Sequence, residues 1–288
     1  MKDGLIISLL SVLPKNKIAS FMGWNARIKL PKTLHRMLIR YFVWKYKINL
    51  EECNGDIDDF NSLSEFFIRT LKPNRRTIDD NHGNLASPVD GRVHTFGKIV
   101  GGQFEQYDGQ IGSVSEMLGR PEEDETCQRY HNGEFIIIYL SPQDYHRVHS
   151  HDDGVLKEIQ YQPGQLWPVF PVATQRIPHL FDRNERLVFH IEHPARSNTN
   201  SVLSMIGAFG VGRMTTDWNP IITNTNQPQQ DITVKKTIQR GDEVGRFELG
   251  STIILFFEPN QIQHWSVTSG QKVELGECIA TYSLDKSS

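Results

Sequence analysis

The sequence predicts an α+β fold, with helices in residues 1–80 and a β-rich core with lipoyl- or hybrid-type hairpins in residues 81–288. Two observations predict it. Apolar residues recur at helical spacing between residues 33 and 48, whereas beyond residue 80 they gather in short runs bounded by glycine, proline or asparagine. With 38% hydrophobic and 23% charged residues, the chain has the composition of a globular protein with a sizeable core.

The first fifty residues are basic and rich in apolar side chains. They hold ten Lys and Arg residues and one acidic residue, Asp3, although the whole chain carries a net charge of -3. The apolar run 5–13 stops at Pro14 and is much shorter than the roughly 20 residues that span a bilayer. A signal peptide is an alternative, but Asp3 interrupts its positive region and no clear small-residue cleavage site follows. A basic terminus on an acidic body favours contact with an anionic surface.

The apolar spacing predicts an amphipathic helix over residues 33–48. Arg36, Arg40 and Lys47 share one face of it, and Trp44 and Tyr46 add aromatic side chains suited to an interface. Such a helix lies on a membrane with its basic residues at lipid phosphates, or packs on the protein with a solvated basic face. The segment alone leaves both open. Nucleic-acid binding is not expected, because no recognised nucleic-acid-binding motif accompanies the charge.

The rest of the chain is divided by turn residues into one further helix and several strands. Ser62 and Glu65 form a capping box that opens a short helix reaching Leu71. Apolar runs at 134–140, 187–191, 202–214 and 253–257 predict buried strands, and the turn 87–91 leads into another. Segments 241–247 and 270–276 resemble each other weakly, and both look like the hairpins of lipoyl-type domains.

Gly250 and Ser251 lie where a loop enters the apolar run 253–257. A serine hydroxyl can attack the carbonyl of the preceding residue when a base removes its proton, and a glycine leaves that carbonyl unshielded. An ordinary Gly-Ser turn at the start of a strand is the simpler alternative. The chemical interpretation therefore depends on a base and an orienting acid elsewhere in the chain.

Three histidines, His146, His149 and His151, directly follow the predicted strand 134–140. Imidazole is the natural general base near neutral pH. A zinc site is an alternative that lacks a Cys or Glu partner nearby in sequence, so no metal is expected; polar loop histidines without chemistry are another. Asp90 precedes a glycine and either forms a turn or accepts a hydrogen bond from a histidine Nδ1–H, as in a catalytic triad.

Four motifs taken together resemble the phosphatidylserine decarboxylase family of the bacterial membrane-associated type. They are Ser87 to Gly91, Tyr145 to His149, Ile177 to Phe181 with Asn184 to Arg186, and Leu249 to Thr252. The resemblance runs from about Phe66 to the C-terminus, whereas the first fifty residues match only in character. One departure is His151, which stands where the family pattern has proline.

The resemblance implies self-cleavage between Gly250 and Ser251 into a β chain, residues 1–250, and an α chain, residues 251–288. Ser251 would attack the Gly250 carbonyl, with His149 as the base and Asp90 orienting that base. Ser251 would then become a pyruvoyl cofactor that forms a Schiff base with the amine of phosphatidylserine and accepts electrons as CO2 leaves. His146 would protonate the resulting carbon, and phosphatidylethanolamine would be released.

The resemblance also implies partners and a location. These are phosphatidylserine, an anionic membrane surface, a heterodimer of α and β chains that pairs into a dimer, and a peripheral position on the cytoplasmic side of the cell membrane. The three widely spaced cysteines agree with a reducing compartment. Two rivals remain. A serine hydrolase would use Asp90, His149 and Ser251 on an external ester, although the Gly-x-Ser-x-Gly elbow is absent. A lipoyl-like binding module would need a lysine at a hairpin tip in the usual setting, and neither hairpin has one.

Overall fold

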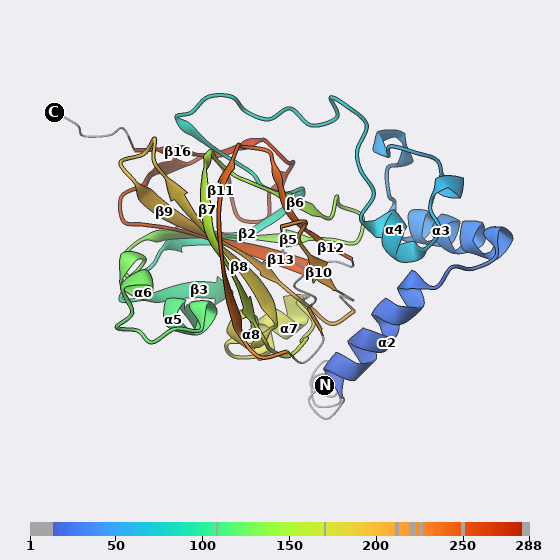
Figure 1. Ribbon diagram of the computed structural model, residues 1–288, viewed down its shortest axis with the longest axis horizontal. Coiled ribbons are helices and arrows are strands. Elements are labelled where there is room, and N and C mark those ends of the chain that lie inside the picture. The colour runs from blue at the N-terminus through green and yellow to red at the C-terminus, as the bar shows by residue number, and fades with distance from the viewer. Residues whose placement is uncertain are drawn as a thin grey trace.

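The computed structural model describes residues 14–107, 109–169, 171–210, 213–218, 223–224, 227–248 and 251–283, with the backbone alone for residues 171, 172, 175 and 251. The apolar run 5–13 and the pair Leu249-Gly250 lie outside the described residues. Figure 1 shows the N-terminal helices gathered to one side of a β-rich body. This arrangement confirms the predicted α+β fold with N-terminal helices.

Two longer helices open the described chain, α2 (Lys15–Arg27) and α3 (Lys32–Tyr46). The second confirms the helix predicted over residues 33–48 and ends where Lys47 adopts a left-handed conformation with φ 55°. The first was not predicted. Its buried face consists mainly of small residues, Ala19, Gly23 and Ala26, which give little hydrophobic periodicity.

The helical part closes with two 3-10 turns, η1 (Leu50–Glu52) and η2 (Ile57–Asp59), and the short helix α4 (Leu63–Phe67). The side chain of Ser62 caps α4 by accepting the backbone N–H of Glu65 at 3.1 Å. The Glu65 carboxylate returns to the N–H of Asn61 and not to that of Ser62, so the predicted box is shifted by one residue. The helix does not reach Leu71, because that residue forms a β-bridge with Cys53.

An antiparallel sheet of eight strands forms the centre of the body, in the order β11-β7-β8-β9-β13-β5-β2-β15. Its middle strands are apolar without alternation because both faces are covered. The predicted strands 134–140, 187–191 and 253–257 are confirmed, whereas the run 202–214 is divided between β9 and the short β10. The bounds are β11 (Gln230–Ile238), β7 (Gly154–Gln162), β8 (Arg186–His193), β9 (Thr199–Ile206), β13 (Ser251–Phe257), β5 (Glu134–Leu140), β2 (Gly91–Lys98) and β15 (Lys272–Val273).

Three smaller sheets and four short helices surround the central sheet. The sheets are β1 (Asn84–Ala86), β16 (Cys278–Tyr282) and β14 (Ile262–Trp265); β10 (Met214–Thr215), β12 (Glu243–Phe247) and β6 (Arg147–His149); and β3 (Gln103–Tyr107) with β4 (Gln110–Ser113). The helices are α5 (Val114–Leu118), α6 (Glu125–Arg129), α7 (Pro171–Arg176) and α8 (Leu180–Arg183). The two similar segments 241–247 and 270–276 contribute β12 and β15, which lie in different sheets.

The helical part is bound to the body at several points. The ammonium of Lys15 lies 3.8 Å from the ring centre of Trp167, and the amide of Asn16 donates to the carbonyl of Gly164 at 2.8 Å. The segment 72–83 then crosses from α4 over the body, where the N–H of Asp79 donates to the carbonyl of Gly276 at 2.9 Å (Figure 1). Within the described residues, no helix is long and apolar enough to cross a membrane.

Candidate active site

Four strands bring the predicted site residues to one end of the central sheet. Strand β13 begins at Ser251, and the backbone of Ser251 pairs with Leu140 at the end of β5. The chain that leaves β5 carries His146 and His149, and its short strand β6 pairs with β12. Residues 248–250 connect β12 to β13. The Gly250–Ser251 bond therefore lies between β12, which pairs with β6 at His149, and β13, which pairs with β5 shortly before His146 in the chain. The side chain of Ser251 lies outside the described residues.

His146 is fully buried and has one unused ring nitrogen. Its Nδ1 lies 2.8 Å from the carbonyl oxygen of Asp144, and since a carbonyl only accepts, Nδ1 carries the proton. Its Nε2 has no hydrogen-bond partner among the residues that the structure describes. Burial lowers the pKa of His146 to about 3, and the positive charge of Arg69 acts in the same direction. The imidazole is thus neutral near pH 7, with a free lone pair on Nε2.

His149 is held in a tautomer suited to a base. Its Nδ1 lies 2.7 Å from the carbonyl oxygen of Gly241, so the proton is on Nδ1. Its Nε2 lies 3.2 Å from the hydroxyl oxygen of Tyr145, which donates to it, and the two rings are stacked with their centres 5.7 Å apart. Burial lowers the pKa of His149 below its usual value, so that Nε2 is available as a proton acceptor at neutral pH.

Asp90 does not form the hydrogen bond to His149 that the triad interpretation expects. The guanidinium of Arg76 binds both oxygens of its carboxylate, at 2.8 and 2.5 Å, and the N–H of Leu275 donates to it at 2.8 Å. The Nδ1–H of His149 donates to the carbonyl of Gly241 instead. Asp90 still acts through space, since its negative charge raises the pKa of His149 against the larger effect of burial.

The third histidine, His151, lies in a separate buried cluster. Its Nε2 is 3.0 Å from the hydroxyl of Ser201, which is also 2.7 Å from Nε2 of His193. The rings of His146, His149 and His151 thus have different partners and do not converge as a shared set of metal ligands.

A family profile described as phosphatidylserine decarboxylase matches residues 63–281. The chain belongs to the phosphatidylserine decarboxylase family. Relatives named phosphatidylserine decarboxylase proenzyme match along almost the whole length. That of Brevibacillus brevis is 37% identical over 287 residues, which is 98% of this chain and 99% of the relative. That of Myxococcus xanthus is 34% identical over 283 residues, 97% and 99% of the two chains, and that of Pseudoalteromonas atlantica is 36% identical over 289 residues, 98% and 99%. The resemblance drawn from the four motifs is confirmed.

In this member of the decarboxylase family, an apolar cavity of about 460 Å³ adjoins the site. Its walls come from both parts of the molecule and include Phe21 of α2, Phe42 of α3, Phe67 of α4 and Leu140 of β5. The ring of Phe67 also packs edge-on against His146, with the centres 5.4 Å apart. The cavity thus reaches the candidate site at Leu140, the residue paired with Ser251, and at the ring of Phe67, which packs on His146.

Several residues that contact the candidate side chains were not predicted from the sequence. Tyr145 contacts His149, Arg76 binds Asp90, Phe67 covers His146, and the carbonyl of Gly241 fixes the tautomer of His149. Tyr145 had a signal, because it begins the motif that contains both histidines. The others had none, since they are joined to their partners by tertiary contacts alone.

Proposed function

We propose that the chain is the precursor of a pyruvoyl-dependent phosphatidylserine decarboxylase that cuts itself between Gly250 and Ser251. The observation that carries the proposal is the position of this bond. It lies between β12, which pairs with β6 at His149, and β13, whose first residue pairs with the last residue of β5. Family membership supports the substrate and the overall reaction, and the name proenzyme, given to the relatives, agrees with a precursor that is processed.

The cleavage uses the chain's own atoms. The hydroxyl oxygen of Ser251 attacks the carbonyl carbon of Gly250, the amide C–N bond breaks, and an ester replaces the peptide bond. Loss of the α-proton and of the Gly250 carboxylate leaves dehydroalanine at position 251. Water then replaces the nitrogen, which departs as ammonia, and a pyruvoyl group remains at the start of residues 251–288.

His149 is the base in this proposal because of its tautomer. The carbonyl of Gly241 keeps the proton on Nδ1, and burial keeps the ring neutral, so that Nε2 can take the proton of the Ser251 hydroxyl. Tyr145 must yield its place on Nε2 when this happens. Asp90 stabilises the imidazolium that forms through its charge, while Arg76 holds the carboxylate in position.

A buried polar atom without a partner among the described residues fits a site that receives a cofactor carbonyl and a polar substrate. It is Nε2 of His146. A pyruvoyl group at position 251 supplies a carbonyl that accepts the substrate amine and takes up the electron pair left by CO2. Because the pKa of His146 is lowered to about 3, this side chain must first accept a proton before it can give one to the carbon that lost CO2. The ammonium group of the substrate, which must lose a proton to react, is a chemical source of it.

The lipid tails have a place in the apolar cavity between the helices and the body, which is lined by α2, α3 and α4. Large apolar side chains are exposed beside it on the same helices, among them Phe21, Trp24, Met37 and Trp44. Such a surface, together with the basic residues of this region, supports peripheral attachment to an anionic membrane on the cytoplasmic side. Assembly of two αβ units into a dimer belongs to the same proposal.

The decisive experiment measures the intact mass and the terminal chemistry of the full chain after expression. We expect a fragment of residues 251–288 that is lighter than a serine-initiated peptide by one ammonia and is blocked at its amino terminus. The same preparation should convert phosphatidylserine in vesicles to phosphatidylethanolamine. Ser251→Ala should remain uncut and inactive, whereas Ser269→Ala, at an exposed serine of another loop, should be processed normally.

An uncut chain that nevertheless forms phosphatidylethanolamine would overturn the proposal, as would a small fragment that begins with ordinary serine. A serine hydrolase built from Asp90, His149 and Ser251 would give a different pattern. It would stay a single chain, hydrolyse an external ester and leave phosphatidylserine without decarboxylation.

A further inference from the structure

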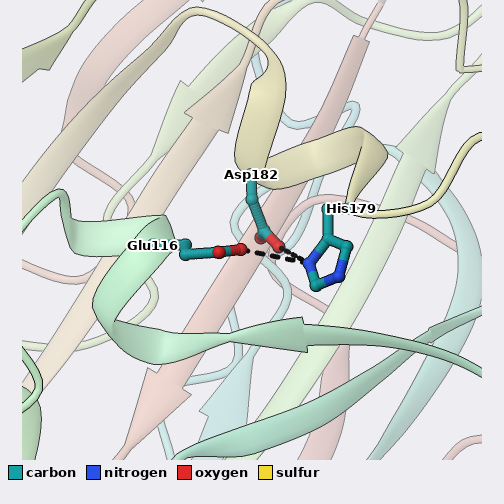
Figure 2. A group of neighbouring side chains, drawn as sticks. All are labelled: Glu116, His179 and Asp182. Atoms are coloured by element: carbon teal, nitrogen blue, oxygen red, sulfur yellow. Dashed lines mark hydrogen bonds and ion pairs between the residues drawn. The ribbon is translucent and has the colours of Figure 1, made fainter.

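Three side chains with metal-ligand chemistry converge on the side of the body formed by α5 and α8. Glu116 projects from α5, His179 precedes α8, and Asp182 lies within it (Figure 2). One ligand atom of each lies within 4.8 Å of the others. Nδ1 of His179 is 3.0 Å from Oε2 of Glu116 and 3.2 Å from Oδ2 of Asp182. This group shares no residue with the decarboxylase site.

We propose that Glu116, His179 and Asp182 bind a divalent transition-metal ion of the zinc class. One imidazole and two carboxylates are a donor set that Zn²⁺ accepts in proteins. Metal–donor bonds of about 2.1 Å at the tetrahedral angle place neighbouring donors about 3.4 Å apart, so the carboxylate oxygens, now 3.0 and 3.2 Å from Nδ1 of His179, would move outward by a few tenths of an ångström on binding. The ion would occupy the point on which the three atoms converge, with water or a surface ligand completing its shell.

A residue outside the cluster orients the buried ligand. The side chain of Asp182 is 3% exposed, and the buried amide of Gln106 donates to its Oδ1 at 2.7 Å. This bond leaves Oδ2 directed toward His179 and Glu116 (Figure 2). A hydrogen bond on the non-ligating atom of a metal ligand is the usual means of fixing its direction.

The two carboxylates of the site lie close together. One oxygen of each is within 4.8 Å of the other, so a positive partner between them stabilises their ionised forms. Arg186 supplies one charge, but its N–H groups donate to the backbone carbonyls of Glu116, Met117 and Asp182 and brace the two segments. Arg183 lines the same cavity, so the guanidiniums of Arg183 and Arg186 balance the two carboxylates, and the attraction of the site for a metal ion comes from its donor atoms.

The site is also accessible. A cavity of about 530 Å³ opens beside the three ligands and is otherwise lined by Pro178 and Arg183. The side chains of Glu116 and His179 are about half exposed, so an ion can enter without unfolding of the core. The competing arrangement is a protonated His179 that bridges two carboxylates. A single N–H directed at two oxygens from one nitrogen is a poorer bond than a metal with a separate bond to each donor.

A metal at this position would join α8 to α5. The chain that leads into α7 and α8 passes through Pro168 and Val169, which line the apolar cavity of the decarboxylase site. The expected role is therefore structural: the ion stabilises one wall of the substrate cavity from outside and takes no part in the chemistry at Ser251. The sequence did not indicate this site because Glu116 is remote from the other two ligands, and no metal was expected.

The test uses the untagged full chain carrying Ser251→Ala, so that the result does not depend on self-cleavage. After dialysis against a chelator, Zn²⁺, Mn²⁺ or Mg²⁺ is added, and metal content, Tm and the absorption spectrum of the Co²⁺ form are measured. We expect one Zn²⁺ per chain, a rise in Tm and a Co²⁺ absorption band. His179→Ala and Glu116→Gln should each weaken Zn²⁺ binding by about tenfold or more.

Matched controls are His264→Ala and Glu51→Gln, which remove one exposed histidine and one exposed carboxylate elsewhere. Both should bind Zn²⁺ as the parent chain does. No Zn²⁺-dependent rise in Tm, or an equal rise in His179→Ala, would overturn the metal site and leave the decarboxylase proposal untouched. If His179→Ala fails to fold, Glu116→Gln decides, because its side chain is exposed and its loss removes little packing.

Discussion

At the scale of single residues, His146 and His149 are distinguished by what their Nε2 atoms contact. Nε2 of His149 accepts a hydrogen bond from Tyr145, whereas Nε2 of His146 has no partner within the described part of the chain. Both rings carry their proton on Nδ1, because in each a backbone carbonyl accepts it. In the proposed mechanism His149 acts once, in self-cleavage, whereas His146 acts with every substrate molecule.

This difference predicts separate effects of removing each histidine. His149→Ala should slow self-cleavage by about a hundredfold or more, which is the usual contribution of a general base, and should accumulate precursor. His146→Ala should still be cut but should form little phosphatidylethanolamine. A time course on a denaturing gel measures the first effect, and lipid analysis of the cut fraction measures the second.

The exposed His264 supplies the control, since His264→Ala should be cut and active. Normal processing of His149→Ala would assign the base elsewhere. If cleaved His146→Ala converted phosphatidylserine at the full rate, His146 would have no role in the chemical step.

At the scale of elements, the connection between β12 and β13 is tied to the N-terminal helices. Its first residue, Glu248, accepts from the guanidinium of Arg27 at 2.7 Å and from the hydroxyl of Ser64 at 3.2 Å. Arg27 ends α2 and Ser64 lies in α4, so both helices hold the residue that stands two positions before Gly250. The helical part therefore restrains the residue that leads into the proposed cleavage site.

Loss of this restraint should slow self-cleavage. Arg27→Ala should lengthen the half-time of processing several-fold, because the segment before Gly250 samples more conformations, and Arg27→Lys should restore part of the rate. The gel time course gives the rate, and Tm shows whether the fold is kept. Arg36→Ala is the control, since its ion pair with Asp58 is exposed and far from Glu248 in sequence. Equal rates of self-cleavage in the parent chain and the three variants would show that the contact of Arg27 with Glu248 does not affect processing.

The exposed face of α3 is the second feature at this scale. Leu34, Met37, Tyr41 and Trp44 form one stripe at helical spacing, and Trp44 is 75% exposed. Two other apolar residues of α3, Leu38 and Phe42, pack on the cluster that contains Phe67. The helix thus packs on the protein with one side and presents apolar side chains to the surroundings with another.

A change of this stripe should weaken attachment to vesicles. Met37→Glu combined with Trp44→Glu should reduce cosedimentation with vesicles that contain anionic lipid by about tenfold, because two apolar side chains no longer enter the interface. Added salt should weaken the binding of the parent chain as well. Ile111→Glu, at an exposed apolar residue of the β body, is the control. Unchanged binding of the double variant would place the contact elsewhere.

At the scale of the whole molecule, the sheet and the segments packed on it bury several histidines in neutral form. Burial lowers the pKa of His146 and His151 to about 3 and that of His190 to about 4, and it also lowers the pKa of His193. In the unfolded chain each titrates near 6.5. Between the two values the unfolded state binds more protons, so the free energy of unfolding falls as the pH falls.

The stability of the fold should therefore decline steeply below about pH 6.5, where the unfolded histidines begin to titrate. Urea unfolding of the Ser251→Ala chain between pH 7.5 and 4.5 measures this slope. His151→Gln should reduce the slope by about one proton, because one buried imidazole no longer resists protonation. His264→Ala, at an exposed histidine, should leave the slope unchanged. A free energy of unfolding that is constant over this range would contradict the prediction.

The sequence determined the features that depend on neighbouring residues. Helical spacing predicted α3, unbroken apolar runs predicted β5 and β13, and the four motifs were sufficient to indicate the family and the candidate residues Asp90, His146, His149 and Ser251. Helix α2 was missed because its buried face is made mainly of small residues. The end of α4 was predicted too late in the chain, because Leu71 forms a β-bridge with Cys53 and is not part of the helix. Such contacts leave no local pattern.

Only the tertiary structure decided which group each candidate residue contacts. Arg76 takes the carboxylate of Asp90, Gly241 takes the Nδ1–H of His149, and Glu248 is held by two helices. The physical reason is that each polar group can form only a few hydrogen bonds, and it forms them with the donors and acceptors that the fold places next to it. Periodicity and spacing describe one stretch of chain at a time, whereas the pairing of β6 with β12 and of β5 with β13 joins stretches about a hundred residues apart.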